Sequence, residues 1–297
     1  MRDLAVLLLL TPAQLSAAYR RSDNAQIAHT MTFSGRTVLV LHAHPDDESI
    51  FTGATIRRVA DSGCRVVLVT ATGGELGGSR VPLAADETVA ERRLAELESA
   101  AETLGVARLV LLGRRDSGLP DTADNVHPGA LAAASTGRLA RRVAQLAAAE
   151  SAEAVIHDDD NGIYGHPDHI AVHRIGRRAA ELAGITSYES TVDRVHIGGV
   201  GSHLLHGAAQ ATGSAYGLVP ARITLTVAAT DEELAAKRAA ILAHASQVDP
   251  ASLAGPGFAD AYRYEWFRRS GRPTVLDQAA SAVREPMRPG LSPLNSM

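Results

Sequence analysis

The sequence has little cysteine, little lysine and no long hydrophobic run, and each shortage excludes a class of protein. Cys64 is the only cysteine among 297 residues, which excludes a disulfide framework and a cysteine-based structural zinc site. Lys237 is the only lysine and the net charge is −4, so the charge does not indicate a nucleic-acid partner. The apolar run at residues 4–10 is too short to span a bilayer, and no membrane partner is predicted.

The two ends of the chain are predicted to lie outside the folded domain. Residues 1–32 are expected to be an N-terminal extension, either disordered or the result of a start assigned too early. Their short apolar run follows a single arginine and no clean cleavage site follows it, so a cytoplasmic location is predicted, with export as the weaker alternative. Residues 271–297 contain four prolines and no clear periodicity, which predicts a loosely ordered tail.

Between these ends, apolar runs of strand length alternate with segments of helical periodicity. The predicted strands cover residues 37–42, 65–70, 108–112, 154–157 and 222–227, and the predicted helices cover 52–62, 86–104, 130–149, 166–183 and 231–245. Near-continuous apolar strands indicate burial on both faces, as in a parallel sheet. The predicted fold is therefore α/β, a Rossmann-like doubly wound and mostly parallel sheet in a single domain from 33 to 270.

The loop after the first strand carries acidic residues where a nucleotide-binding Rossmann domain has glycines. Residues 43–48 read Ala-His-Pro-Asp-Asp-Glu, without the G-x-G-x-x-G that a pyrophosphate requires, which argues against a nicotinamide oxidoreductase. His44 and Asp47 are three residues apart and can turn toward one metal ion, and Asp46 between them could act on a bound water. Capping of the following helix is the alternative, but it requires neither His44 nor two adjacent aspartates.

The loop after the fourth strand repeats the His-Pro-Asp pattern. Residues 164–169 read Tyr-Gly-His-Pro-Asp-His, and the carboxyl ends of parallel strands meet where ligands bind. A catalytic zinc site needs three protein ligands, and one histidine of this loop completes the set with His44 and Asp47. His169 opens the following helix and is the better candidate. His166 would then act as an acid or an oxyanion stabiliser, oriented by Asp168. His173, one turn beyond His169, is an alternative ligand, although a supporting or surface role is the more economical reading.

Together these two motifs resemble those of the PIG-L/LmbE-like zinc deacetylases, which remove N-acetyl groups from glucosamine-containing molecules. The resemblance runs from about Thr37 to His244 and is closest to the mycothiol-pathway deacetylases and amidases. Further similar segments are Thr-Gly-Gly-Glu at 72–75, Arg-Leu-Ala-Glu at 93–96, Arg-Asp-Ser-Gly at 115–118 and His-Ala-Ser-Gln at 244–247. One departure concerns the substrate: the mycothiol-pathway deacetylase has a long insertion after the last catalytic motif, which this chain lacks.

The resemblance implies a role for each matching residue. His44, Asp47 and His169 would bind zinc, with Asp46 as the general base and His166 as the group that stabilises the oxyanion or protonates the amine. Tyr164 would polarise the substrate carbonyl. Three residues would bind the substrate: Arg93, Asp116 and Glu75, the last at the rim of the pocket.

The sequence therefore predicts a metal-dependent hydrolase that removes the N-acetyl group of an N-acetylglucosamine-containing small molecule or glycoconjugate. An amidase of a mycothiol-type thiol conjugate, a deacetylase of an antibiotic or lipid glycan and a non-catalytic sugar-binding protein are the alternatives. Iron(II) is the alternative to zinc, because two histidines and a carboxylate also suit it. The predicted partner is a small amino-sugar substrate; a homo-oligomer is left open.

Overall fold

The computed structural model describes residues 32–255 and 257–281. Residues 1–31 of the expected extension and 282–297 of the expected tail lie outside the described residues. Among the described residues, no helix has the length and apolar content needed to cross a bilayer.

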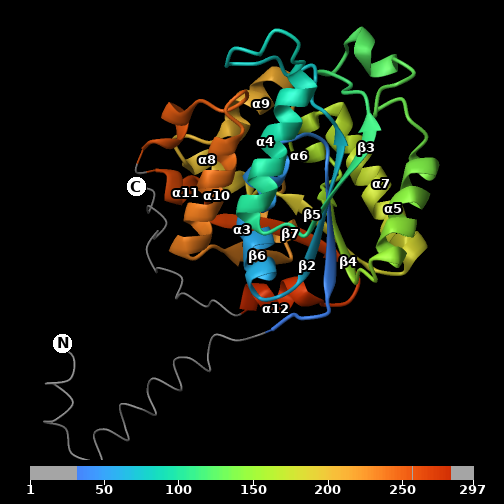
Figure 1. The fold of residues 1–297 in the computed structure, drawn as a ribbon. Coiled ribbons are helices and arrows are strands. Elements are labelled where there is room, and N and C mark those ends of the chain that lie inside the picture. The colour runs from blue at the N-terminus through green and yellow to red at the C-terminus, as the bar shows by residue number, and fades with distance from the viewer. Residues whose placement is uncertain (1–31, 256, 282–297) are drawn as a thin grey trace, which may run out of the picture. The chain divides into compact units, whose positions relative to one another are not determined.

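A seven-stranded mixed sheet organises the chain (Figure 1). In chain order its strands are β1 Thr37–His42, β2 Arg65–Thr72, β3 Arg108–Arg114, β4 Ala154–Asp158, β5 Thr186–Thr191, β6 Leu225–Ala228 and β7 Tyr264–Ser270. Their spatial order is β3-β2-β1-β4-β5-β7-β6. The five strands from β3 to β5 are parallel, whereas β7 runs antiparallel to both β5 and β6. The predicted doubly wound, mostly parallel α/β sheet is confirmed.

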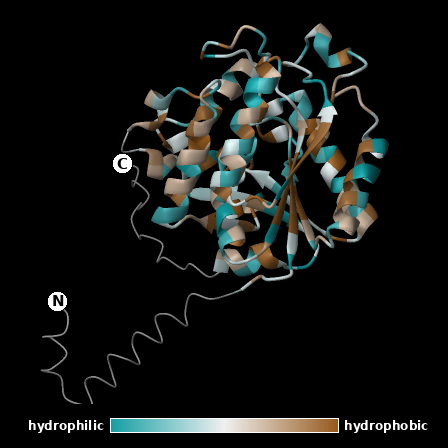
Figure 2. Cartoon of the chain, viewed as in Figure 1, coloured by the Kyte–Doolittle hydropathy of each residue, from teal (hydrophilic) through white to brown (hydrophobic). Residues whose placement is uncertain are grey.

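Helices cover both faces of this sheet, and alternate residues of its central strands pack in opposite directions. Val38 and Val40 of β1 pack with α3 (Asp47–Asp61), α4 (Val89–Leu104), α10 (Asp231–Ala243) and α12 (Val275–Ser281). Leu39 and Leu41 of the same strand pack with α5 (Thr136–Ala149) and α7 (Pro167–Ala183). The hydropathy colouring accordingly shows apolar central strands between amphipathic helices (Figure 2). Two-sided burial explains why these strands read as continuous apolar runs.

Local signals in the sequence set most helix ends. Thr88 and Glu91 form a capping box before α4, which ends at the left-handed Gly105, and Thr230 and Glu233 form a second box before α10. Helix α3 differs from the prediction, because it begins at Asp47 and not at Thr52. Helix α5 also begins later than predicted, at Thr136, after a turn.

The sequence prediction missed several elements in the second half of the chain. The smaller ones are α6 Gly162–Gly165, α8 Arg194–Gly199, α9 Leu204–Thr212 and α11 Phe258–Tyr262. The expectation of a loosely ordered tail from residue 271 is wrong for residues 275–281. Helix α12 buries Val275, Leu276 and Ala279 against the sheet, which anchors this segment despite the nearby prolines.

A candidate metal centre at the switch point of the sheet

The two His-Pro-Asp loops meet where the strand order reverses. Strands β1 and β4 are parallel neighbours, and the chain continues from them to opposite sides of the sheet. The carboxyl ends of such a strand pair open the crevice in which α/β proteins bind ligands. Residues 43–48 follow β1 and residues 159–169 follow β4, so the topology brings the predicted site residues together.

The three predicted metal ligands surround a common point. Asp47 Oδ2 lies 3.6 Å from His44 Nδ1 and 3.5 Å from His169 Nε2, and all three side chains are buried. The two histidines hold the pKa of the Asp47 carboxyl far below its usual range despite its burial. Two imidazole nitrogens and a carboxylate oxygen that converge on one point fit a divalent cation such as zinc. Ring nitrogens of His44, His166 and His169 also lie within 4.8 Å of one another, so His166 borders the same point.

A further pair of carboxylates orients these ligands. Asp158 Oδ2 lies 2.9 Å from His169 Nδ1, and Asp168 Oδ2 lies 3.2 Å from His44 Nε2. Metal-binding histidines commonly keep their other ring nitrogen on a carboxylate, which sets the ring orientation. His42 contacts the remaining oxygen of Asp158 at 3.0 Å. The sequence analysis did not predict a role for His42 or Asp158. The one feature that could have indicated it is that each is a polar residue at the end of an otherwise apolar strand.

The predicted pairing of Asp168 with His166 is wrong. The Asp168 carboxylate faces His44 and accepts hydrogen bonds from the backbone N–H and the hydroxyl of Ser117, after β3. His166 instead caps α7, and its Nδ1 accepts the backbone N–H of Asp168. His166 and Asp168 lie two residues apart at the start of α7, so their side chains point in different directions from the helix. They therefore contact different residues.

Asp46 lies beside the metal point and lines the same cavity as Asp47. Its backbone has φ 114° and ψ −30°, a conformation that non-glycine residues rarely adopt. Its carboxylate lies 3.2 Å from Arg93 Nη2. Burial raises the pKa of the Asp46 carboxyl to about 6, and the positive charge of Arg93 opposes that rise. A carboxylate with such a pKa is suited to accept a proton near neutral pH.

Tyr164 and His166 complete the chemistry-bearing groups. The Tyr164 hydroxyl lies 3.2 Å from His169 Nε2. Burial, together with Asp47, Asp46 and Asp158, raises the pKa of Tyr164 well above its usual value, so its hydroxyl keeps its proton. Burial and the nearby His44 and His169 lower the pKa of His166 to about 2. The site therefore presents a neutral phenol and a neutral imidazole beside the carboxylates.

The three predicted substrate residues occupy different places. Arg93 is buried, and it donates to the carbonyl oxygens of Gly74 at 2.8 Å and Pro45 at 2.6 Å. Asp116 lies in the cavity wall, where it accepts the N–H groups of Leu76 and Gly118. Glu75 accepts the backbone N–H of Asp116 at 3.0 Å and lines neither of the cavities described next, so the predicted substrate contact is replaced by a supporting one.

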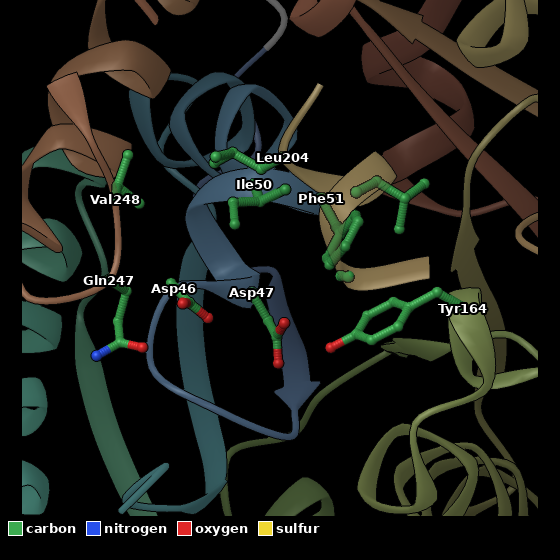
Figure 3. A pocket seen from close by; sticks show the side chains of 10 residues that line it. Asp46, Asp47, Ile50, Phe51, Tyr164, Leu204, Gln247 and Val248 are labelled. Carbon is green, nitrogen blue, oxygen red and sulfur yellow. The ribbon is translucent and has the colours of Figure 1, made fainter. Parts of the chain in front are cut away.

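Two cavities open beside these groups. The larger, about 430 Å³, is lined by polar side chains that include His44, Arg93, Asp116 and His166. The smaller, about 220 Å³, adjoins Asp46 and Asp47 and is otherwise mostly apolar (Figure 3). Asp46, Tyr164, Ala208 and Gln247 line both. His173 lines neither; its Nδ1 lies 3.2 Å from the carbonyl oxygen of Asp158.

Comparisons with known proteins identify relatives of this chain. The family model described as "PIG-L: GlcNAc-PI de-N-acetylase" matches residues 39–180. A 1D-myo-inositol 2-acetamido-2-deoxy-α-D-glucopyranoside deacetylase of Salinispora arenicola is 36% identical over 240 residues, covering 73% of this chain and 78% of the relative. A protein of the same description from Catenulispora acidiphila is 44% identical over 160 residues, half of each chain. The fold is similar to that of an N,N′-diacetylchitobiose deacetylase from Pyrococcus horikoshii, with a TM-score of 0.50, 21% identity and coverage of 79% of this chain and 84% of the other.

Proposed function

The chain belongs to the PIG-L family and is an amide-hydrolysing enzyme, and we propose that it removes the N-acetyl group from an N-acetylglucosamine-containing small molecule. The observation that carries this proposal is the buried trio His44, Asp47 and His169, with the Asp46 carboxylate in the wall of the same cavity. The inositol glycoside in the name of the Salinispora relative is the proposed substrate class.

The donor set supports a zinc ion held by His44, Asp47 and His169, with iron(II) as the alternative. Such an ion supplies Lewis-acid chemistry, since it lowers the pKa of water and polarises a carbonyl oxygen. Asp158 and Asp168 hold the rings of His169 and His44 in the orientation that this binding requires.

The other side chains of the site transfer protons, stabilise the oxyanion and bind the sugar during amide hydrolysis. Asp46 accepts the proton of the attacking water, because its carboxylate lines the cavity beside the three ligands. The protonated Tyr164 hydroxyl donates a hydrogen bond to the carbonyl oxygen as negative charge develops there. A proton then reaches the leaving amine from Asp46, whereas the neutral His166 ring serves as a hydrogen-bond donor to the developing oxyanion. Arg93 and Asp116, which line the larger cavity, contact the hydroxyls of the sugar in this proposal.

The direct test measures both the acetate and the free sugar amine released from free N-acetylglucosamine, its inositol glycoside and a thiol conjugate, with and without chelator and added zinc. We expect chelator-sensitive release that is fastest for the inositol glycoside. Faster cleavage of the thiol conjugate would instead favour the amidase. Stoichiometric zinc without acetate from any compound would contradict the proposed deacetylase.

A pair of variants tests the ligand assignment in the same assay. His169→Gln should lose both bound metal and activity, because it removes one nitrogen of the trio. His173→Gln should retain bound metal, because the His173 ring contacts the backbone carbonyl of Asp158 and the ring of His157, and neither is one of the three proposed ligands. The cytoplasmic location expected from the sequence remains a prediction, as does a homo-oligomer.

A further inference from the structure

Gln247 lies at the junction of the two cavities, beside the reacting groups. Of the residues that line both cavities, the polar ones are Asp46, Tyr164 and Gln247. The backbone N–H of Gln247 donates to the carbonyl oxygen of His244, the residue that caps the end of α10, at 2.9 Å. The side chain is therefore anchored where it can reach a substrate that occupies either cavity.

The two ends of the Gln247 amide have different surroundings. Its Nε2 donates to the carbonyl oxygen of Gly78 at 2.8 Å and to the hydroxyl oxygen of Ser246 at 3.1 Å. Exchanging the amide nitrogen and oxygen would bring two oxygens to 2.8 Å, so these contacts fix the orientation of the amide. Within the described part of the chain Oε1 makes no hydrogen bond, and Gly77 leaves space beside it, since a Cβ there would lie 2.9 Å from Oε1. Gln247 therefore offers the junction a hydrogen-bond acceptor with free lone pairs.

Gln247 and Tyr164 approach the reacting groups from opposite sides. In Figure 3 the Gln247 oxygen and the Tyr164 hydroxyl point toward each other, with Asp46 and Asp47 between them. A secondary amide is planar and trans, so its C=O and its N–H point in opposite directions. When the carbonyl oxygen accepts the Tyr164 hydroxyl, the N–H is directed toward Gln247.

We propose that Oε1 of Gln247 accepts a hydrogen bond from the N–H of the amide that is cleaved, and that this contact selects amides over esters. The proposal rests on the proposed deacetylase function and adds a specificity-determining residue to it. An ester carries an oxygen without hydrogen at this position, so the Gln247 oxygen would face a second acceptor. A site that hydrogen-bonds a donor of its substrate discriminates against an analogue without that donor, because its own polar group is left unpaired.

The same contact orients the nitrogen for the proton transfer that releases the amine. Water adds its oxygen to the acyl carbon and gives a proton to Asp46, and the nitrogen acquires a free lone pair. Because Gln247 holds the existing N–H, this lone pair points away from Gln247, toward the side on which Asp46 lies (Figure 3). Asp46 then gives its proton to the nitrogen and the C–N bond breaks. The sugar amine leaves with both hydrogens, together with acetic acid, which ionises to acetate.

The experiment uses the full chain loaded with zinc and two compounds, the inositol glycoside with a 2-acetamido group and the same glycoside with a 2-O-acetyl group. Acetate release above the protein-free rate gives kcat/KM for each. Gln247→Met keeps the length of the side chain but removes the amide acceptor. We expect it to lower the amide-to-ester ratio of kcat/KM at least ~10-fold, through a loss on the amide.

Gln210→Met is the matched control, because Gln210 is exposed on α9 and lines neither cavity. It should leave the amide-to-ester ratio unchanged. Gln247→Met also removes the hydrogen bond to Gly78, but a displaced loop would slow both compounds alike. A contact between Gln247 and a sugar hydroxyl, which both compounds carry, would likewise leave the ratio as it is. An unchanged ratio in Gln247→Met would therefore overturn the proposal.

The same data distinguish this proposal from the function on which it rests. Amide hydrolysis by the unmodified protein, with an unchanged ratio in Gln247→Met, would leave the deacetylase function standing and overturn the role of Gln247. No hydrolysis of either compound by zinc-loaded protein would overturn both. If the ester alone is not hydrolysed, it is used as a competitive inhibitor, and the reciprocal of its inhibition constant replaces kcat/KM in the ratio.

Discussion

Asp46 combines a strained backbone with several specific restraints. A positive φ at a residue with a side chain costs about 1–3 kcal/mol and persists only where surrounding contacts enforce it. Here Asp46 donates its N–H to Glu48 at 3.0 Å, and Glu48 is held by the buried His244 at 2.8 Å. Arg93 holds the carbonyl of Pro45 and the Asp46 carboxylate. The strain lets adjacent aspartates face different ways, Asp47 toward the histidines and Asp46 toward the cavities.

The role of Asp46 as a base that is not a ligand can be tested by Asp46→Asn. Asparagine keeps the shape and the contacts of the loop but cannot accept the proton from water. We expect kcat to fall at least ~10²-fold while the bound metal remains stoichiometric. The measurement is kcat and metal content on the same preparation. Asp47→Asn is the control variant and should lose metal. Loss of metal from Asp46→Asn would make Asp46 a ligand.

For Arg93 the structure changes the expected kinetic effect. A substrate-binding arginine would affect KM above all, and the family resemblance suggests that result for Arg93→Ala. Because the guanidinium also holds Pro45 and Asp46, we expect kcat to fall more than KM rises, by about 10²-fold, as for a misplaced catalytic group.

Arg93→Lys should recover part of the lost kcat, because a lysine can still pair with the Asp46 carboxylate. Steady-state kinetics of both variants on the inositol glycoside give the measurement, with thermal unfolding to confirm that they fold. A rise in KM with unchanged kcat would show that Arg93 binds the substrate and does not position Asp46.

At the scale of an element, helix α3 is held in place by a buried ion pair. The Glu265 carboxylate accepts the N–H groups of Ala54 and Thr55, in the middle of the helix, each at 2.8 Å. The only lysine, Lys237, neutralises this carboxylate at 2.7 Å, and both side chains are 1% exposed. Gly53 allows the approach, since a Cβ there would lie 3.2 Å from Lys237 Cγ. Helix α3 begins with Asp47, so these contacts also position the metal ligand.

Lys237→Met tests this pairing. Methionine fills most of the space but leaves the Glu265 charge buried without its partner, which typically costs about 3–5 kcal/mol. Urea unfolding should show a loss of this size. Arg80→Met removes one partner of an exposed ion pair with Asp249 and should change stability little. Equal losses of unfolding free energy in the two variants would show that the buried ion pair stabilises the fold no more than the exposed one.

Across the whole molecule, the sequence predicts the parallel half of the sheet better than the rest. Strands β1 to β4 are apolar on both faces, so their runs stand out. Strand β5 is missed because its buried residues are mostly polar: Glu189 is buried against Arg268 of β7, a partner 79 residues away. The paired His-Pro-Asp motifs predict the ligands for a similar reason, since each directly follows a recognisable strand. The supporting pairs, such as His42 with Asp158, depend on which strands become neighbours, and no local pattern specifies that.

The same burial of polar groups makes the stability of the whole fold depend on pH. His203 stacks on Tyr262 with a centroid distance of 4.3 Å, and its Nδ1 accepts the N–H of Leu205 at the start of α9. Burial and the nearby Lys237 lower the pKa of His203 to about 3. An unfolded histidine titrates near 6.5, so below that pH the unfolded chain binds more protons than the folded protein. The contribution of His203 is therefore complete above pH 6.5 and decreases as the pH falls toward 3.

His203→Asn removes this titration but retains a side chain that can cap α9. The stability advantage of the unmodified protein over His203→Asn should shrink by about 2 kcal/mol between pH 7 and pH 5, because a histidine kept neutral costs that much at the lower pH. Urea unfolding of both proteins at the two pH values, at a fixed zinc concentration, provides the measurement. His127→Asn, at an exposed position, should show no such change. The outcome that contradicts the prediction is an equal difference in unfolding free energy between the two proteins at both pH values. It would mean that His203 is protonated as readily in the folded protein as in the unfolded chain.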